Sequence, residues 1–121
     1  MALRVTRRRK KMSEEKKEIV ESLVALKDSL SKIEYVDRQE IQKLIDDTII
    51  EIQDARCEGI KISVALSKVI EKMNRSLAFN GLKLDRQTSL IWDHLKDLYD
   101  KSKRSERTAV SILKGLWGMN S

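Results

Sequence analysis

The 121-residue sequence contains no proline, four glycines and only 4% aromatic residues. Turns between strands rely on glycine and proline, and strands are enriched in aromatic residues, so a multistranded sheet is disfavoured. The length suits one domain with a single core. Hydrophobic residues form 40% of the chain and charged residues 36%, a mixture typical of helices that bury one face. We therefore expect an all-α fold.

Residues that could support catalysis or bind a metal are equally scarce. Cys57 is the only cysteine, which excludes an internal disulfide, and His94 is the only histidine. His94 lies beside an apolar helical arc and is interpreted as structural. The sequence has no P-loop, GxGxxG or HExxH motif. We expect no enzyme, no cofactor, no catalytic residue and no metal site.

Long apolar runs are also missing. None approaches the ~20 residues that a membrane-spanning helix needs. The basic N-terminus is followed by Met-Ser-Glu-Glu-Lys-Lys, not by the apolar core of a signal peptide. A single free cysteine fits a reducing compartment. We expect a cytoplasmic protein.

The net charge of +6 comes from a short N-terminal arm. Residues 1–11 contain six basic residues and no acidic one, whereas the rest of the chain holds 19 of each. We interpret residues 1–12 as a disordered, solvated arm, and Met12 before Ser-Glu-Glu resembles a natural start. Two alternatives remain open, since clustered cations also bind anionic membrane surfaces or nucleic acid.

A first helix is expected over residues 13–34. Ser13 is the N-cap candidate, and Glu14 and Glu15 follow where carboxylates favour the positive end of the helix dipole. Apolar side chains then alternate at spacings of four and three, which places them on one stripe. They are Ile19, Leu23, Leu26, Leu30 and Ile33.

A second helix is expected over residues 38–57. The segment Asp-Arg-Gln-Glu at 37–40 resembles a capping box. Ile50 lies nearly opposite the apolar arc, and a lone exposed isoleucine is ordinary on a protein surface. The arc, with Ile49 at its edge, contains Ile41, Leu44, Ile45, Thr48, Ile52 and Ala55.

A third helix is expected over residues 63–79. Ser63 can cap its start, and Asn80-Gly81 can end it because these residues readily adopt the left-handed conformation that follows a helix. Its apolar stripe begins just before the cap. The stripe contains Ile62, Leu66, Val69, Ile70, Met73 and Leu77.

A fourth helix is expected over residues 86–103, with Asp85 as N-cap. Its stripe contains Ile91, Leu95 and Leu98, and we place Trp92 and Tyr99 at the border. Helices of this length joined by short connections predict an antiparallel up-and-down four-helix bundle over residues 13–103. Each arc can be buried within one chain, so a monomer is expected; an oligomerisation module using Ile50 is an alternative.

The segment 104–121 is interpreted as a C-terminal tail or a short helix. Serines at 102, 105 and 111 weaken the expectation of a continuous helix, and a helix could restart at Ser105. In that helix Val110, Leu113 and Trp117 would share one stripe. Trp117 would either fold back onto the bundle or serve as a contact residue.

The order of several short segments resembles the enterocin A immunity family. These are the Ser-Glu-Glu start, GIKI at 59–62 leading into ALSKVIEKMNRSL, and NGLKL at 80–84 before LIWDHLKDLYD. The similarity extends from about Met12 to Lys103 and consists of packing and turn motifs. It implies a four-helix antiparallel bundle whose length is similar to this chain counted from Met12, so the basic arm departs from the family pattern.

The resemblance also implies a binding function. Proteins of this family protect producers of pediocin-like bacteriocins by engaging the bacteriocin-occupied membrane subunits of the mannose phosphotransferase permease from the cytosolic side. Their specificity lies in the C-terminal half, which points to cations and an aromatic anchor in this chain. The candidate partner-binding residues are Lys101, Lys103, Arg104, Arg107, Lys114 and Trp117. Transient contact with the inner face of the membrane would accompany this role.

A different class of function remains as the alternative. A small helical nucleic-acid-binding or regulatory protein could use the arm around residues 7–11. No predicted helix has the basic character of a recognition helix, and no helix pair resembles a helix-turn-helix. Nucleic acid is therefore the weaker prediction for the partner.

Overall fold

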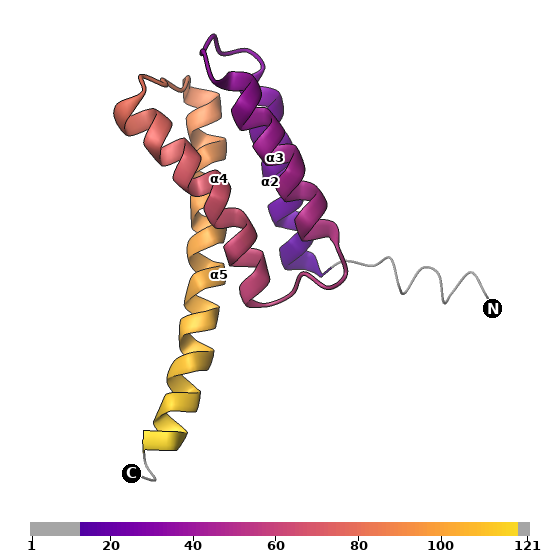
Figure 1. The fold of residues 1–121 in the computed structure, drawn as a ribbon, viewed down its shortest axis with the longest axis vertical. Coiled ribbons are helices and arrows are strands. Elements are labelled where there is room, and N and C mark those ends of the chain that lie inside the picture. The colour runs from indigo at the N-terminus through magenta and orange to yellow at the C-terminus, as the bar shows by residue number, and fades with distance from the viewer. Residues whose placement is uncertain (1–12, 119–121) are drawn as a thin grey trace, which may run out of the picture.

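The computed structural model describes residues 13–118, with side chains as far as Arg104. The regular elements within this range are four α-helices: α2 (Glu14–Leu30), α3 (Arg38–Gln53), α4 (Ile60–Phe79) and α5 (Arg86–Gly118). Successive helices run in opposite directions (Figure 1). Helix α2 packs against α3 and α5, and α4 also packs against α3 and α5. The expected all-α, up-and-down four-helix bundle is confirmed.

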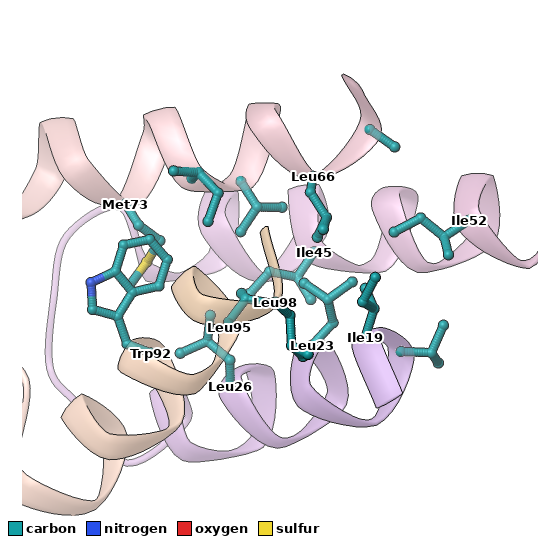
Figure 2. Close-up of a cluster of buried hydrophobic side chains, with 14 of the residues drawn as sticks. Ile19, Leu23, Leu26, Ile45, Ile52, Leu66, Met73, Trp92, Leu95 and Leu98 are labelled. Carbon is teal, nitrogen blue, oxygen red and sulfur yellow. The ribbon is translucent and has the colours of Figure 1, made fainter. Parts of the chain in front are cut away.

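The core is formed by apolar stripes from all four helices. Figure 2 shows Leu23 and Leu26 of α2 facing the same interior as Ile45, Leu66 and Leu95. Most of the predicted stripe residues are buried. The buried hydrophobic side chains are Ile19, Val20, Leu23, Leu26, Leu30, Ile41, Ile45, Ile52, Cys57, Ile62, Ala65, Leu66, Val69, Ile70, Met73, Leu82, Trp92, Leu95 and Leu98.

Trp92 belongs to this core, so its predicted border position is wrong. Its side chain is only 3% exposed and belongs to the same cluster of buried side chains as Met73 (Figure 2). The predicted place of Ala55 on the buried arc is also wrong. Helix α3 ends at Gln53, so Ala55 lies exposed in the connection that follows.

Two of the expected N-caps form and two do not. The backbone N–H of Lys16 donates to Ser13 Oγ at 3.2 Å, and that of Thr88 donates to Asp85 Oδ1 at 2.8 Å. Asp37 precedes α3 but makes no capping hydrogen bond through its side chain. Helix α4 begins at Ile60, before Ser63, with Gly59 as its N-cap.

Two connections depend on glycine. Gly59, at φ 57°, and Gly81, at φ 79°, adopt the left-handed region that a side chain disfavours. After Gly81 the chain turns back, and the N–H of Leu82 donates to the carbonyl oxygen of Ser76 at 3.0 Å. Leu82 is buried, so this turn both ends α4, as expected, and closes one end of the core.

Helix α5 continues without interruption from Arg86 to Gly118, so the end expected at residue 103 is wrong. No proline or glycine occurs between residues 86 and 114 to interrupt it. Serine lowers helix propensity by well under ~1 kcal/mol, too little to end a helix anchored by packing. The C-terminal part of α5 extends beyond the ends of the other three helices (Figure 1). Among the described residues, no helix combines the length and apolar character needed to span a bilayer.

Candidate partner-binding surface

All six residues predicted to bind a partner lie on helix α5. The structure describes the side chains of Lys101, Lys103 and Arg104; those of Arg107, Lys114 and Trp117 lie outside the described residues. The six therefore share one helical backbone, whereas the sequence predicts a helix to residue 103 followed by a tail or a short helix. A continuous helix fixes their order and spacing along one axis, at about 1.5 Å per residue.

The first part of this surface is held firmly by the bundle. Ser102 is buried, although Lys101 and Arg104 on either side are exposed. The Nζ of Lys103 lies 5.1 Å from the centre of the Tyr99 ring, where a cation is attracted by the ring's negative face. A similar contact two helical turns earlier places Lys96 Nζ 5.4 Å from the Trp92 ring. The cations thus begin where α5 leaves the core.

These three cations retain positive charge that a partner could use. Among the side chains that the structure describes, none forms an ion pair with Lys101, Lys103 or Arg104. Asp97 and Asp100 precede Lys101 and Arg104 by four residues, a spacing that weakly attracts opposite charges on a helix. The net charge of this turn is therefore smaller than a count of cations suggests.

The structure divides the charge of the chain into three parts. Residues 13–100, which form the bundle, carry 14 basic and 18 acidic residues. Residues 101–118, at the end of α5, carry five basic residues and one acidic residue, and residues 1–12 carry six basic residues and none that is acidic. Counted from Met12 the chain is neutral, but that balance combines an acidic bundle with a basic helix end.

A second surface feature, which sequence reasoning missed, is a pocket between the end of α3 and the start of α4. Its volume is about 340 Å³. Ile50 and Val64 line it and are 69% and 55% exposed. The sequence suggested only an isolated Ile50, because the two residues belong to different helices. The lining residues are Ile50, Glu51, Asp54, Arg56, Cys57, Lys61 and Val64.

Charged groups at this pocket are largely paired with one another. The Arg56 guanidinium donates to both carboxylate oxygens of Asp54, at 3.2 Å and 3.0 Å, and the Arg56 backbone N–H donates to Oδ1 at 2.8 Å. These hydrogen bonds, led by those of the side chain, lower the pKa of Asp54 to about 2. Lys68 Nζ lies 3.5 Å from Glu51. The pairing leaves no uncompensated carboxylate to act as a base here.

The chain has one cysteine and one histidine, and both lie among the described residues. Cys57 is buried, and desolvation raises the pKa of its thiol, which disfavours the nucleophilic thiolate. His94 is half-exposed in a shallow groove between α2 and α5, where its Nε2 lies 3.4 Å from Glu18 Oε1. Among the described residues, no group of three His, Cys, Asp or Glu side chains is arranged to hold a metal ion.

Comparison of the chain with protein-family models, with characterised proteins and with solved structures gives no match in any of the three. The functional argument therefore rests on the sequence and on the arrangement of its charged and aromatic residues. The feature that combines both is the basic end of α5.

Proposed function

We propose that this chain is an immunity protein that protects its cell from a pediocin-like bacteriocin. It would do so by binding the bacteriocin-occupied membrane subunits of the mannose phosphotransferase permease from the cytosolic side. The observation that carries the proposal is the basic end of α5, rooted in a four-helix antiparallel bundle. The bundle is the fold that the resemblance implies, and the basic end lies in the C-terminal half, where that family carries its specificity.

The proposed mechanism is recognition without chemistry. The bundle acts as a platform that fixes the direction of α5, because Tyr99 packs against the core and Ser102 is buried at the point where the helix leaves it. Charges on α5 speed the approach to a membrane-embedded partner, and burial of Trp117 then slows its release. Occupancy of the receptor would block the pore that the bacteriocin opens.

The direct test is survival of a bacteriocin-sensitive bacterium that expresses this chain. Two forms are compared, full length and beginning at Met12, against a panel of pediocin-like peptides. Selective protection by both forms is expected, because the proposed contacts lie on α5. Expression is verified in each culture by immunoblot, and the cells carrying empty vector set the baseline.

The same assay separates the proposal from its alternative. Absence of protection against every peptide, with intact protein present in the cells, would contradict the immunity function. Protection only by the full-length form would assign the activity to residues 1–12. Binding of duplex DNA that depends on salt and on residues 1–11 would favour the nucleic-acid function instead.

A further inference from the structure

The pocket between α3 and α4 lies where the two helices meet their connection, residues 54–59 (Figure 1). Its apolar wall combines Ile50 from α3, Val64 from α4 and Cys57 from the connection. The volume of about 340 Å³ falls at the lower end of the ~300–1,000 Å³ that small-molecule sites occupy. The pocket is therefore large enough for a small ligand.

The part of the wall that comes from the connection is held in place through Asp54. Its main-chain carbonyl oxygen accepts hydrogen bonds from Lys16 Nζ and from the Cys57 N–H, both at 2.9 Å. Its carboxylate accepts hydrogen bonds from the side chain and from the backbone N–H of Arg56. A wall held by these contacts is formed before a ligand arrives, so binding loses little free energy to ordering of the chain.

Apolar side chains that are exposed to water meet at this pocket. Ile50 and Val64 are both more than half exposed, although an isolated exposed apolar residue is ordinary. Because both line one pocket, a single alkyl chain bound there would remove both from water. Each methylene group that a ligand buries strengthens binding about fourfold.

The charges that line the pocket leave one cation without a partner. The lining carboxylates are Glu51, which is paired with Lys68, and Asp54, which is paired with Arg56. Lys61 is exposed at the pocket, and no side chain that the structure describes forms an ion pair with it. A ligand with one negative charge would complement this cation, whereas a cationic ligand would find both lining carboxylates already paired.

We propose that this pocket binds a small amphipathic carboxylate, an alkanoate, with its alkyl chain between Ile50 and Val64 and its carboxylate beside Lys61. This site goes beyond the immunity function, because it lies between α3 and α4, whereas the proposed receptor contacts lie on α5. Its test needs only purified protein and ligand. Each of the two proposals can therefore fail alone.

The test is titration of the full-length, isotopically labelled protein with octanoate, monitored through the NMR shifts of the backbone amides. The shifts should saturate and should be largest over residues 50–64. A dissociation constant of about 1 mM or tighter is expected for a ligand of this size. Octanoate should bind about 15-fold more tightly than hexanoate, which has two methylene groups fewer. Absence of saturation by ~10 mM, or shifts centred on another part of the bundle, would overturn the site.

The head group is tested with ligands that have the same alkyl chain. Octanol removes the charge, and octylamine, as its ammonium ion, reverses it. An ion pair near the surface strengthens binding about twofold to fivefold, so octanoate should exceed octanol by that factor. The octylammonium ion should bind more weakly than octanol. Equal affinity for octanoate and octanol would overturn the choice of a carboxylate.

A pair of variants tests the cation. Lys61→Gln should remove the preference for octanoate over octanol and leave the binding of octanol unchanged. Lys83→Gln is the matched control, because Lys83 is exposed and lies outside the pocket, and it should keep the preference. A preference that persists in Lys61→Gln would overturn the position of the carboxylate beside Lys61.

The apolar wall is tested with I50A/V64A, which should weaken octanoate binding on the order of tenfold. The matched control is V24A/L90A, because Val24 and Leu90 are exposed apolar residues outside the pocket, and it should bind as the unaltered protein does. Circular dichroism verifies that both variants keep their helicity. Equal weakening in the two variants would show a non-specific apolar association and would overturn the pocket as the binding site.

Discussion

The ammonium group of Lys16 donates a hydrogen bond to the main-chain carbonyl oxygen of Asp54 at 2.9 Å. This contact joins the first turn of α2 to the connection between α3 and α4, 38 residues away. The side chain of Lys16 is buried, at 7% exposure, which is unusual for lysine. Both parts of the side chain stabilise the fold. The aliphatic stem covers the core, and the ammonium group donates a hydrogen bond to a carbonyl at the end of α3.

Replacing Lys16 with alanine should lower the free energy of unfolding by about 1–3 kcal/mol. The loss combines the hydrogen bond from a charged donor with the packing of the stem. Urea unfolding followed by circular dichroism measures it. Lys16→Met restores the stem, so the difference between the two variants separates packing from the hydrogen bond.

The control is Lys17→Ala, because Lys17 lies on the same turn but is exposed. It should change the free energy of unfolding by less than ~0.5 kcal/mol. Equal losses at both positions would contradict the role given to Lys16.

Trp92 should be among the most sensitive core positions. Its indole is 3% exposed within the core cluster, and truncation would leave a cavity that the helices can only partly close. Trp92→Ala should destabilise the bundle by about 3–5 kcal/mol, and Trp92→Phe by less. The matched control is Phe79→Ala, because Phe79 is 83% exposed and should contribute within ~0.5 kcal/mol. A small effect of Trp92→Ala in denaturant unfolding would show that Trp92 lies at the edge of the core and contributes little to its packing.

Asp54 should give the bundle a stability contribution that disappears in acid. Hydrogen bonds from Arg56 lower the pKa of the folded state to about 2, against 3.8 for an unperturbed aspartate. A lowered folded-state pKa means that the unfolded chain takes up the proton first as the pH falls. The contribution is therefore complete above pH ~5 and is lost between about pH 4 and pH 2.

The measurement is the difference in unfolding free energy between the unaltered protein and Asp54→Asn, taken from pH 7 to pH 2. Other carboxylates titrate in both proteins and cancel in this difference. The difference should stay level down to about pH 5 and then shrink. A difference that remains level to pH 2 would show that Arg56 does not hold the carboxylate in solution.

Cys57 should react slowly with thiol reagents while the protein is folded. Its side chain is buried, and the same burial raises the thiol pKa, so both access and thiolate fraction are reduced. Labelling by a disulfide reagent at pH 8 should be much slower than for a cysteine peptide and should rise steeply across the urea transition. Labelling as fast as the peptide in the absence of urea would show that the connection between α3 and α4 opens readily.

The arrangement of the helices could be predicted from the sequence because it follows from periodic patterns. The stripe through Leu23 and Leu26 marks a buried face whatever its partner, and short connections leave few alternatives to antiparallel neighbours. Helix ends were harder to place. Ser63 has the chemistry of an N-cap, but Gly59 supplies the backbone conformation that starts α4 one turn earlier. Backbone conformation of this kind is set by tertiary packing and leaves little trace in composition.

The candidate surface was only partly predictable for a related reason. Positions such as Lys101 and Arg104 follow from charge and location, but the sequence does not reveal that Ser102 is buried or that α5 continues past residue 103. Serine looks unfavourable for a helix when read alone. The pocket beside Ile50 requires the relative placement of two helices, which no single stretch of sequence contains.

Trp117→Ala is expected to abolish protection against the bacteriocin while leaving the bundle intact. Trp117 lies at the far end of α5, beyond the residues that pack in the core, and a large aromatic side chain is the kind of anchor that dominates binding at interfaces. Survival of cells expressing the variant gives the functional result, and thermal unfolding of the purified protein gives the structural one.

Leu90→Ala is the matched control, because Leu90 is an exposed apolar residue near the other end of the same helix. This variant should retain protection. Loss of protection together with a large fall in Tm would instead make Trp117 a structural anchor that folds onto the bundle. Full protection with an unchanged Tm would remove it from both roles and leave the cations of α5 as the contacts to test next.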